Sequence, residues 1–371
     1  ASALAAGGKL FNSIFGIDYK IALTIGAVVI LVYTFMGGFW AVCTTDFVQG
    51  SLMLVALLAI PIVAFAFLGG DVSGALAATG VDSATFLNVF ASGSTGRFSF
   101  IEIISQLAWG LGYMGMPHIL VRFMAVKDEK ELDKSKVIAI VWVALSLLFA
   151  VIIGVVGRAY LFPTLLTDGA EENVFIEMII KIFTVDINLP IIGGIFLCGV
   201  LAAIMSTADS QLLVSASSVA EDIYQGVLGK KADDKKTMTV SRITVVVIAV
   251  LAYLIALNPN SSIMGLVSNA WAGLGSAFGP IVVMALFWKR TNLKGAIAGV
   301  ASGAIAVILW DYIPLVGGQT LGTVTGLYSL VVGFALSLIC IVVVSLLTEE
   351  PTADMLQEFE DVKNGNIAGL K

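Results

Sequence analysis

The stretch that decides the fold lies at residues 101–124, which read IEIISQLAWGLGYMGMPHILVRFM. It is apolar and long enough to cross a bilayer, because a membrane-spanning helix needs about 20 mostly apolar residues. Gly110, Gly112 and Gly115 weaken the helix near its middle. Pro117 follows them and removes a further helical hydrogen bond. The stretch therefore predicts a membrane helix that is discontinuous at its centre.

The composition of the whole chain indicates a membrane protein. Of its 371 residues, 58% are hydrophobic and 12% are charged, whereas about a quarter of the residues in soluble domains are charged. A water-soluble protein of this size could not hide so much apolar surface in one core, so the lipid bilayer must solvate much of it. We therefore expect an all-α membrane protein with several spans.

Several stretches have the length and apolar character of a span. These nine stretches are residues 20–42, 46–69, 101–124, 136–162, 188–216, 239–257, 262–288, 293–313 and 321–347. Residues 1–15 resemble the end of an earlier span, and residues 348–371 form a short polar tail.

The positions of Lys and Arg predict the orientation. When the nine stretches are threaded alternately, most of the 20 basic residues fall on one side, in the loops 122–136, 230–242 and 289–294 and in the tail. Cytoplasmic loops carry such an excess of Lys and Arg. The chain is therefore expected in the cytoplasmic membrane, with its C-terminus in the cytoplasm.

Two kinds of site are disfavoured by the sequence. The glycines at 110, 112 and 115 match the GxGxxG dinucleotide fingerprint, but that fingerprint needs a preceding strand in a soluble βαβ unit. The three cysteines lie far apart and His118 is the single histidine, so neither a zinc nor a haem site is expected. Nothing in the sequence points to a nucleic-acid partner.

Two aromatic residues flank the glycines of the discontinuous helix. Trp109 and Tyr113 are four residues apart, on one face of any remaining helix. Backbone without regular helical bonds is tolerated at membrane depth where it lines a cavity, as in the midplane sites of secondary transporters. The two rings could stack on a small ligand there. Alternatively, the segment is a glycine-rich packing face, and the aromatic side chains only fill the space between helices.

A second motif lies in the stretch 188–216. Ala203, Ser206 and Thr207 occupy positions i, i+3 and i+4 and share one helical face. Two hydroxyls and a backbone carbonyl suit Na⁺, which prefers oxygen ligands, and neutral ligands release a monovalent ion readily. Alternatively, the hydroxyls bond back to the preceding turn or to a neighbouring helix.

Two acidic residues lie inside or beside predicted spans, where ionisable groups are functional candidates. Asp46 opens the stretch 46–69, so it could instead be a solvated residue favoured by the helix dipole. Asp209 could instead face cytoplasmic water near the basic loop and pair with Lys230 or Lys231.

Motifs of one known family are spread over nearly the whole chain. They are YTFMGGF at 33–39, Thr45-Asp46, WGLGY at 109–113, Gly115, PHIL at 117–120, RFM at 122–124, AIMST at 203–207, QLLV at 211–214, Glu221-Asp222, LVS at 266–268, AWAG at 270–273 and FGP at 278–280. The sequence resembles the sodium/solute symporter family on these motifs, and WGLGY with PHIL is specific for its proline-transporting branch.

The resemblance implies a thirteen-span transporter with a five-plus-five inverted repeat, in which this chain is a single transmembrane domain over residues 1–371 starting at the end of the fourth span. The implied parts are the end of an earlier span at 1–15, the last two helices of the first repeat at 20–69, the second repeat at 101–288, two extra spans at 293–347 and a cytoplasmic tail at 348–371.

The resemblance also implies binding residues. Ala203, Ser206 and Thr207 correspond to the sodium site of the family. The wall of the proline site is assigned by the same likeness to Trp109, Tyr113 and Pro117. A possible second cation site comprises Asp46, Ser206, Asp209 and Ser210. Asp209 departs from the pattern of the proline carriers, which leaves the ion stoichiometry open.

The implied function is secondary active transport, in which Na⁺ entry drives uptake of L-proline. The protein is then not an enzyme, and Na⁺ is a coupling ion with no further cofactor. Two alternatives stay open, namely a sodium symporter for another solute such as pantothenate or a sugar, and the membrane input domain of a sensor protein.

Overall fold

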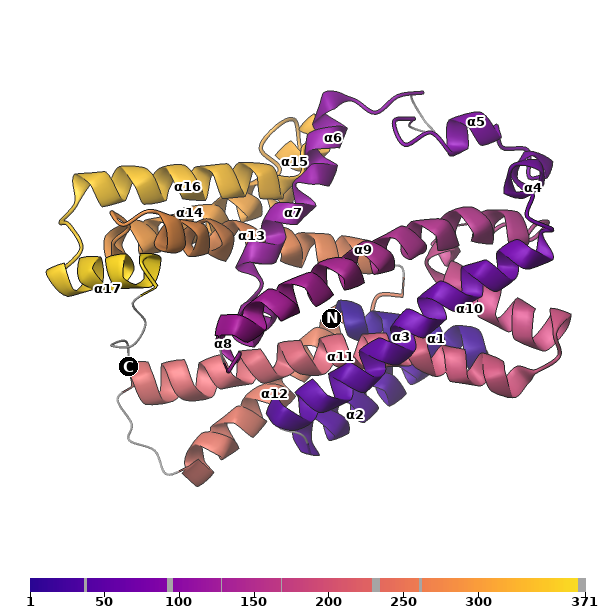
Figure 1. The fold of residues 1–371 in the computed structure, drawn as a ribbon, viewed down its shortest axis with the longest axis horizontal. Coiled ribbons are helices and arrows are strands. Elements are labelled where there is room, and N and C mark those ends of the chain that lie inside the picture. The colour runs from indigo at the N-terminus through magenta and orange to yellow at the C-terminus, as the bar shows by residue number, and fades with distance from the viewer. Residues whose placement is uncertain are drawn as a thin grey trace. The chain divides into compact units, whose positions relative to one another are not determined.

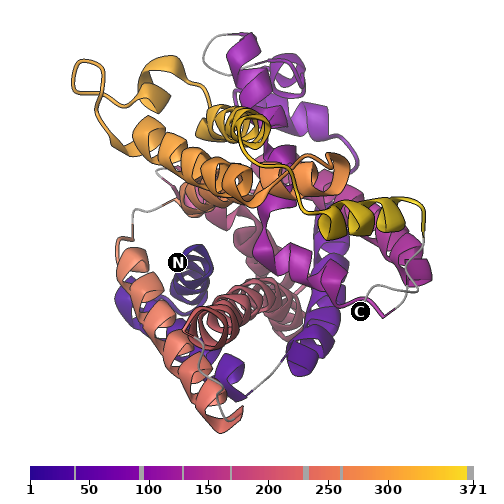
Figure 2. The ribbon, with the colours of Figure 1, turned by 90° about the vertical axis from the view of Figure 1, so that its left-hand side faces the viewer.

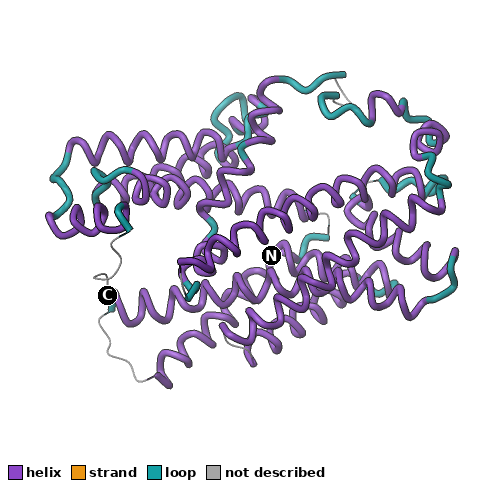
Figure 3. Tube along the Cα trace, viewed as in Figure 1, coloured by secondary structure: helices purple, strands orange, loops and turns teal. Residues whose placement is uncertain are grey.

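The chain folds almost entirely into helices joined by short loops (Figure 3). The computed structural model describes residues 1–36, 39–91, 96–127, 129–167, 169–228, 234–259 and 262–365. Within these ranges there is no β-strand, and an isolated bridge joins Val316 to Gln319. The predicted all-α fold is confirmed.

Two compact units divide the chain, and each is described by itself. Unit 1 contains residues 1–93 and 126–266, and unit 2 contains residues 94–125 and 267–371. The helices of unit 1 are α1 (Ser2–Phe15), α2 (Tyr19–Met36), α3 (Phe39–Phe67), α4 (Val72–Ala78), α5 (Ser83–Phe86), α9 (Glu129–Tyr160), η2 (Ala170–Asn173), α10 (Val174–Ile180), η3 (Lys181–Asp186), α11 (Pro190–Ser217), η4 (Ser218–Val227) and α12 (Asp234–Ala256).

Helix α11 is the centre of unit 1. It packs against α3 most extensively and also contacts α12, α1 and α2 (Figures 1 and 2). One apolar cluster, in which Ile60 and Ile179 are buried, joins α3 and α9 to α10 and η3, and Leu197 of α11 packs against it. A second joins α1, α2 and α12 to α11 around Leu23 and Ala208. Both sides of α11 are therefore fixed by apolar packing.

The helices of unit 2 are α6 (Phe100–Leu107), α7 (Trp109–Gly112), η1 (Tyr113–Gly115), α8 (Pro117–Met124), α13 (Ile263–Phe287, from residue 267), α14 (Leu293–Tyr312), α15 (Leu321–Thr325), α16 (Ser329–Leu347) and α17 (Ala353–Lys363). Helices α14 and α16 lie side by side (Figure 1). A Cβ atom on Gly295 or Gly299 of α14 would collide with Ser345 or Ile341 of α16. Small residues allow this close approach, as is usual between membrane helices.

Seven helices of the described residues are long and apolar enough to cross a membrane. They are Val42–Phe67, Lys130–Tyr160, Pro190–Val227, Lys235–Ala256, Ile263–Phe287, Leu293–Tyr312 and Ser329–Leu347. These seven coincide with seven of the nine predicted stretches. Of the other two, 20–42 corresponds to the shorter α2, and 101–124 is divided into four pieces.

Several predicted helix ends are wrong. Helix α9 begins at Glu129 rather than 136, because its charged first turns remain helical. Helix α11 does not stop at 216 but continues as the π-helix η4 to Val227. The last stretch begins at Ser329, since residues 321–325 form the separate helix α15.

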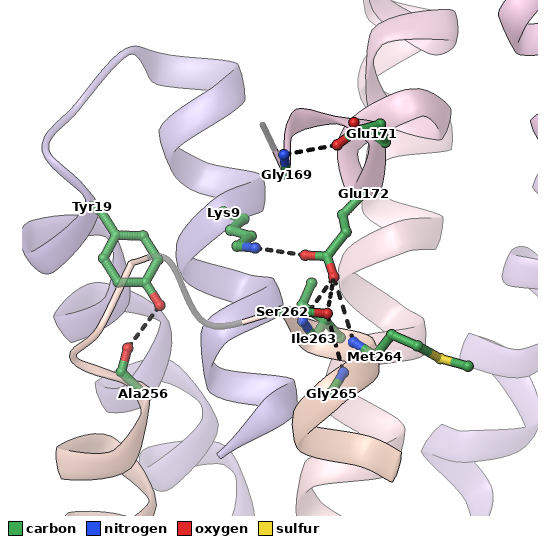
Figure 4. Close-up of polar contacts among 10 residues, drawn as sticks. All are labelled: Lys9, Tyr19, Gly169, Glu171, Glu172, Ala256, Ser262, Ile263, Met264 and Gly265. Atoms are coloured by element: carbon green, nitrogen blue, oxygen red, sulfur yellow. Dashed lines mark hydrogen bonds and ion pairs between the residues drawn. The ribbon is translucent and has the colours of Figure 1, made fainter. Parts of the chain in front are cut away.

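One carboxylate connects three segments of unit 1 (Figure 4). Glu172, in η2, accepts a hydrogen bond from Lys9 of α1 at 2.5 Å. Its other oxygen accepts the Ser262 hydroxyl at 3.0 Å and the Ile263 amide at 2.8 Å. The first amides of a helix lack helical partners and favour a negative charge. Glu172 therefore stabilises the first turn of α13 and holds α1 beside it.

Candidate functional site

The discontinuous helix of unit 2 breaks at the residues that predicted the break. After α6 the chain forms the single turns α7 and η1, and Met116 then adopts an extended conformation with φ −85° and ψ 111°. Helix α8 starts afresh with Pro117 in its first turn, where the missing amide of proline costs no helical bond. The predicted discontinuity is confirmed.

Aromatic rings gather at this break. The Trp109 ring stacks on Trp271 at a centroid distance of 5.9 Å and on Tyr328 at 5.8 Å. Tyr113 meets Trp271 edge-on at 4.8 Å and leaves 43% of its own surface exposed. The Trp271 indole donates a hydrogen bond to the Trp109 carbonyl at 2.9 Å. The cluster offers a broad, partly open aromatic surface of the kind that holds an apolar ring.

Two of the motif glycines permit close packing on α13. A Cβ atom at Gly112 would collide with the Trp271 indole, and one at Gly115 would lie 2.6 Å from the Leu274 carbonyl oxygen. Gly110, by contrast, has open space at the corresponding position. The predicted break and the alternative of a glycine packing face therefore describe the same segment, since the glycines serve both.

The Ala203, Ser206 and Thr207 group lies on α11 in unit 1. The Ser206 and Thr207 hydroxyls both donate to the Ala203 carbonyl, at 3.2 and 3.0 Å. This is the local bonding that the alternative interpretation predicted. It does not use up the acceptors, because a donating hydroxyl keeps two lone pairs. Three oxygens thus lie within one turn of the helix, and Thr207 is exposed.

The acidic residues meet one of the predicted serines. Ser210 of α11 donates its hydroxyl to Asp46 of α3 at 3.1 Å. Asp209 accepts the Ser210 amide at 2.6 Å and is completely buried. Three members of the predicted second cation site are therefore neighbours in the structure. Oxygen-rich groups of this kind suit a hard cation.

The structure contradicts the exposed position expected for Asp209 and the helix-opening position expected for Asp46 in the alternative interpretations. Asp209 does not face water, because the packing of α11 in unit 1 buries it. Its proposed partners Lys230 and Lys231 lie outside the described residues. Asp46 does not open its helix, because α3 begins at Phe39, about two turns earlier.

Sequence reasoning missed Trp271 and Tyr328 as members of the aromatic cluster. Tyr328 donates its hydroxyl to the Ser268 carbonyl at 2.7 Å and its amide to Ser105 at 3.0 Å. Both residues are far from Trp109 in the chain. The available signal was Trp271 itself, a large aromatic between small residues in an AWAG stretch.

Comparison with known proteins places these features in a family. The sodium:solute symporter family model matches residues 1–303. The osmoregulated proline transporter OpuE of Bacillus subtilis is 44% identical over 353 residues, which cover 95% of this chain and 68% of OpuE. The sodium/proline symporter of Staphylococcus aureus is 42% identical over 368 residues, which cover 98% of this chain and 69% of the relative.

A solved structure shares the fold. The substrate-bound, outward-open structure of a Na⁺-coupled sialic acid symporter matches this chain with a TM-score of 0.70. The match covers 95% of this chain and 71% of the other, at 19% sequence identity. The likeness is one of fold.

Proposed function

Because the chain belongs to the sodium:solute symporter family, we propose that it couples Na⁺ entry to the uptake of L-proline. It is a multi-pass membrane transporter and not an enzyme. The observation that carries the choice of proline is the identity of 42 to 44% to two proline transporters over nearly the whole chain. The aromatic cluster at the helix break supports it, because a pyrrolidine ring fits an aromatic wall.

The sodium ion is assigned to the oxygens of α11. The Ala203 carbonyl and the hydroxyls of Ser206 and Thr207 converge within one turn. These ligands are neutral, so the ion can leave on the cytoplasmic side. Sodium binding favours the state that binds proline, and by linkage proline raises the affinity for sodium by the same factor.

Proline is assigned to the broken helix. Trp109 and Tyr113 provide the aromatic wall, and Pro117 starts the helix on the far side of the break. The backbone groups near Met116 are suited to the charged ends of an amino acid, as in other carriers with broken helices.

A second cation or a proton is assigned to Asp46, Ser206, Asp209 and Ser210. The hydrogen bond between Ser210 and Asp46 and the burial of Asp209 support this assignment. A buried carboxylate is stabilised either by a bound cation or by protonation. In the proposed topology the whole chain is one transporter domain, its C-terminus is cytoplasmic, and residues 101–288 form the second repeat.

Uptake by the purified protein in proteoliposomes tests the proposal. Radiolabelled proline should accumulate under an inward Na⁺ gradient and should not accumulate when K⁺ replaces Na⁺. Radiolabelled pantothenate and glucose are tested in the same way. Sodium-driven accumulation of either of these in place of proline would reassign the substrate, and the absence of any sodium-driven flux would favour a sensor role.

A further inference from the structure

A cavity of about 220 Å³ lies in unit 1 at the end of α9, away from the residues assigned to sodium. Its wall is largely apolar and includes Phe86, Leu161 and Val174. Arg158 and Glu171 are its charged residues. A cavity with an apolar body and one charge of each sign suits an amphiphile whose head carries both charges.

Arg158 has a buried hydrogen-bond donor that indicates a ligand. Its Nε atom is buried and, among the described residues, has no hydrogen-bond partner. A cation at the end of a helix is favoured by the helix dipole, but the dipole does not satisfy a buried N–H donor. A guanidinium matches the geometry of a phosphate or carboxylate better than any other side chain.

The surface of α9 leads from the membrane to this cavity. Leu147, Val151, Gly154 and Arg158 share one helical face. Leu147 and Val151 are 57% and 66% exposed, and Gly154 is also exposed. Since Arg158 lies in the last turn of the span Lys130–Tyr160, this apolar face ends in a cation at the level of the membrane surface.

Glu171 defines the rest of the head group. It lines the same cavity, and its carboxylate is oriented by the Gly169 amide at 2.8 Å. A carboxylate repels a purely anionic head and attracts an ammonium group. The two charges therefore match a phosphodiester that also carries an ammonium group, and a primary ammonium suits the carboxylate best because it has N–H donors that a quaternary ammonium lacks.

We propose that this cavity is a binding site for one phospholipid with an ethanolamine head group. Arg158 binds the phosphate and Glu171 the ammonium, while an acyl chain lies on the face of Leu147, Val151 and Gly154. Gly154 leaves room for that chain, because a Cβ atom at this position meets nothing within 4 Å.

Native mass spectrometry of the full chain tests the site. The protein is released from vesicles that contain phosphatidylethanolamine, phosphatidylglycerol and phosphatidylcholine with identical acyl chains. Wild type should retain phosphatidylethanolamine preferentially. Arg158→Gln should lower the retention of all three lipids by about tenfold, the value of a charge-assisted hydrogen bond. Glu171→Gln should keep retention but abolish the preference for ethanolamine.

Two further variants separate the site from general lipid contact. Gly154→Leu should reduce retention without changing any charge, and it should fold because position 154 is exposed and a Cβ atom there meets nothing within 4 Å. Lys20→Gln removes an exposed cation outside the cavity and should behave as wild type.

Retention by Arg158→Gln equal to that of wild type would overturn the proposal. Equally strong binding of soluble phosphoethanolamine would also overturn it, since the acyl chain would then play no part. The measurement needs neither sodium nor proline, so its failure leaves the proposed transport untouched.

Discussion

The Ser-Thr segment of α11 and the broken segment α6 to α8 both place polar groups within a membrane protein, but in opposite ways. Helix α11 runs without a break past Ser206 and Thr207 and presents hydroxyls from a rigid scaffold. In the other segment the helix is interrupted at Met116, and aromatic rings stack on one another beside the break. A small ion needs a few fixed oxygens, whereas an amino acid needs a wall and free backbone, so the two architectures suit two different ligands.

The largest expected effect is a loss of stability and of uptake when the glycine packing of the broken segment is disrupted. Gly115→Ala places a Cβ atom 2.6 Å from the Leu274 carbonyl oxygen, and a backbone atom cannot move aside easily. We expect a loss of stability of about 1–3 kcal/mol and little remaining uptake. Gly110→Ala is the matched control and should be neutral, because its Cβ atom meets open space. Thermal unfolding in detergent and uptake in proteoliposomes measure both, and equal behaviour of the two variants would contradict the packing role.

The second largest effect is expected on the sodium dependence of uptake, when hydroxyls of α11 are removed. Ser206→Ala and Thr207→Ala each remove one oxygen from the group around the Ala203 carbonyl. Each should raise the sodium concentration for half-maximal uptake by about tenfold or more, because a lost ligand costs about 1–3 kcal/mol. The control is Ser215→Ala, which removes the same kind of hydroxyl bond, to the Gln211 carbonyl, elsewhere on the helix. If all three variants keep the sodium dependence of wild type, the ion binds elsewhere.

The third largest effect is expected at the aromatic wall, where a substitution should separate proline binding from sodium binding. Trp109→Ala removes the ring that stacks on both Trp271 and Tyr328. It should weaken proline binding by about twofold to twelvefold while leaving sodium binding nearly unchanged, since stacking contributes about 0.5–1.5 kcal/mol. Isothermal titration with each ligand measures the two affinities. The control is Trp310→Ala, whose indole donates to the Leu327 carbonyl. An equal loss of both affinities in Trp109→Ala would show that the ring only supports the fold.

The sequence predicted local features of both segments well. The break follows from the chemistry of Gly and Pro, and the shared face of Ala203, Ser206 and Thr207 follows from helical periodicity. Burial of Asp209 could not be predicted, because it depends on which face of α11 meets its neighbours. The bond between Trp271 and Trp109 joins residues 162 positions apart, and no local pattern records such a pairing.

Asp209 gives a smaller effect, on stoichiometry rather than on rate. It is the fully buried acid beside the bond between Ser210 and Asp46. Asp209→Ser should preserve proline uptake but lower the charge moved per proline, or its dependence on pH, because a site for a cation or proton is lost. Asp222→Ser, at an exposed position, is the control. The charge-to-proline flux ratio is measured in proteoliposomes at two pH values. Ratios identical to wild type at both values would remove Asp209 from the ion site.

The smallest expected effect lies outside both segments, at the first turn of α13. Burial alone raises the pKa of Glu172, but the Lys9 ammonium and the Ser262 hydroxyl outweigh it and hold that pKa below its ordinary value of 4.5. Because the folded-state pKa is lowered, the carboxylate stabilises the fold above pH 4.5, and this contribution is lost as the pH falls through the folded-state pKa.

Glu172→Gln should therefore cost about 1 kcal/mol at pH 7, as expected for a partly exposed ion pair. The variant and wild type should become equally stable at acidic pH, where both side chains are neutral. Thermal unfolding from pH 3 to pH 8 measures the difference. A stability difference independent of pH would show that Glu172 acts through its packing and not through its charge.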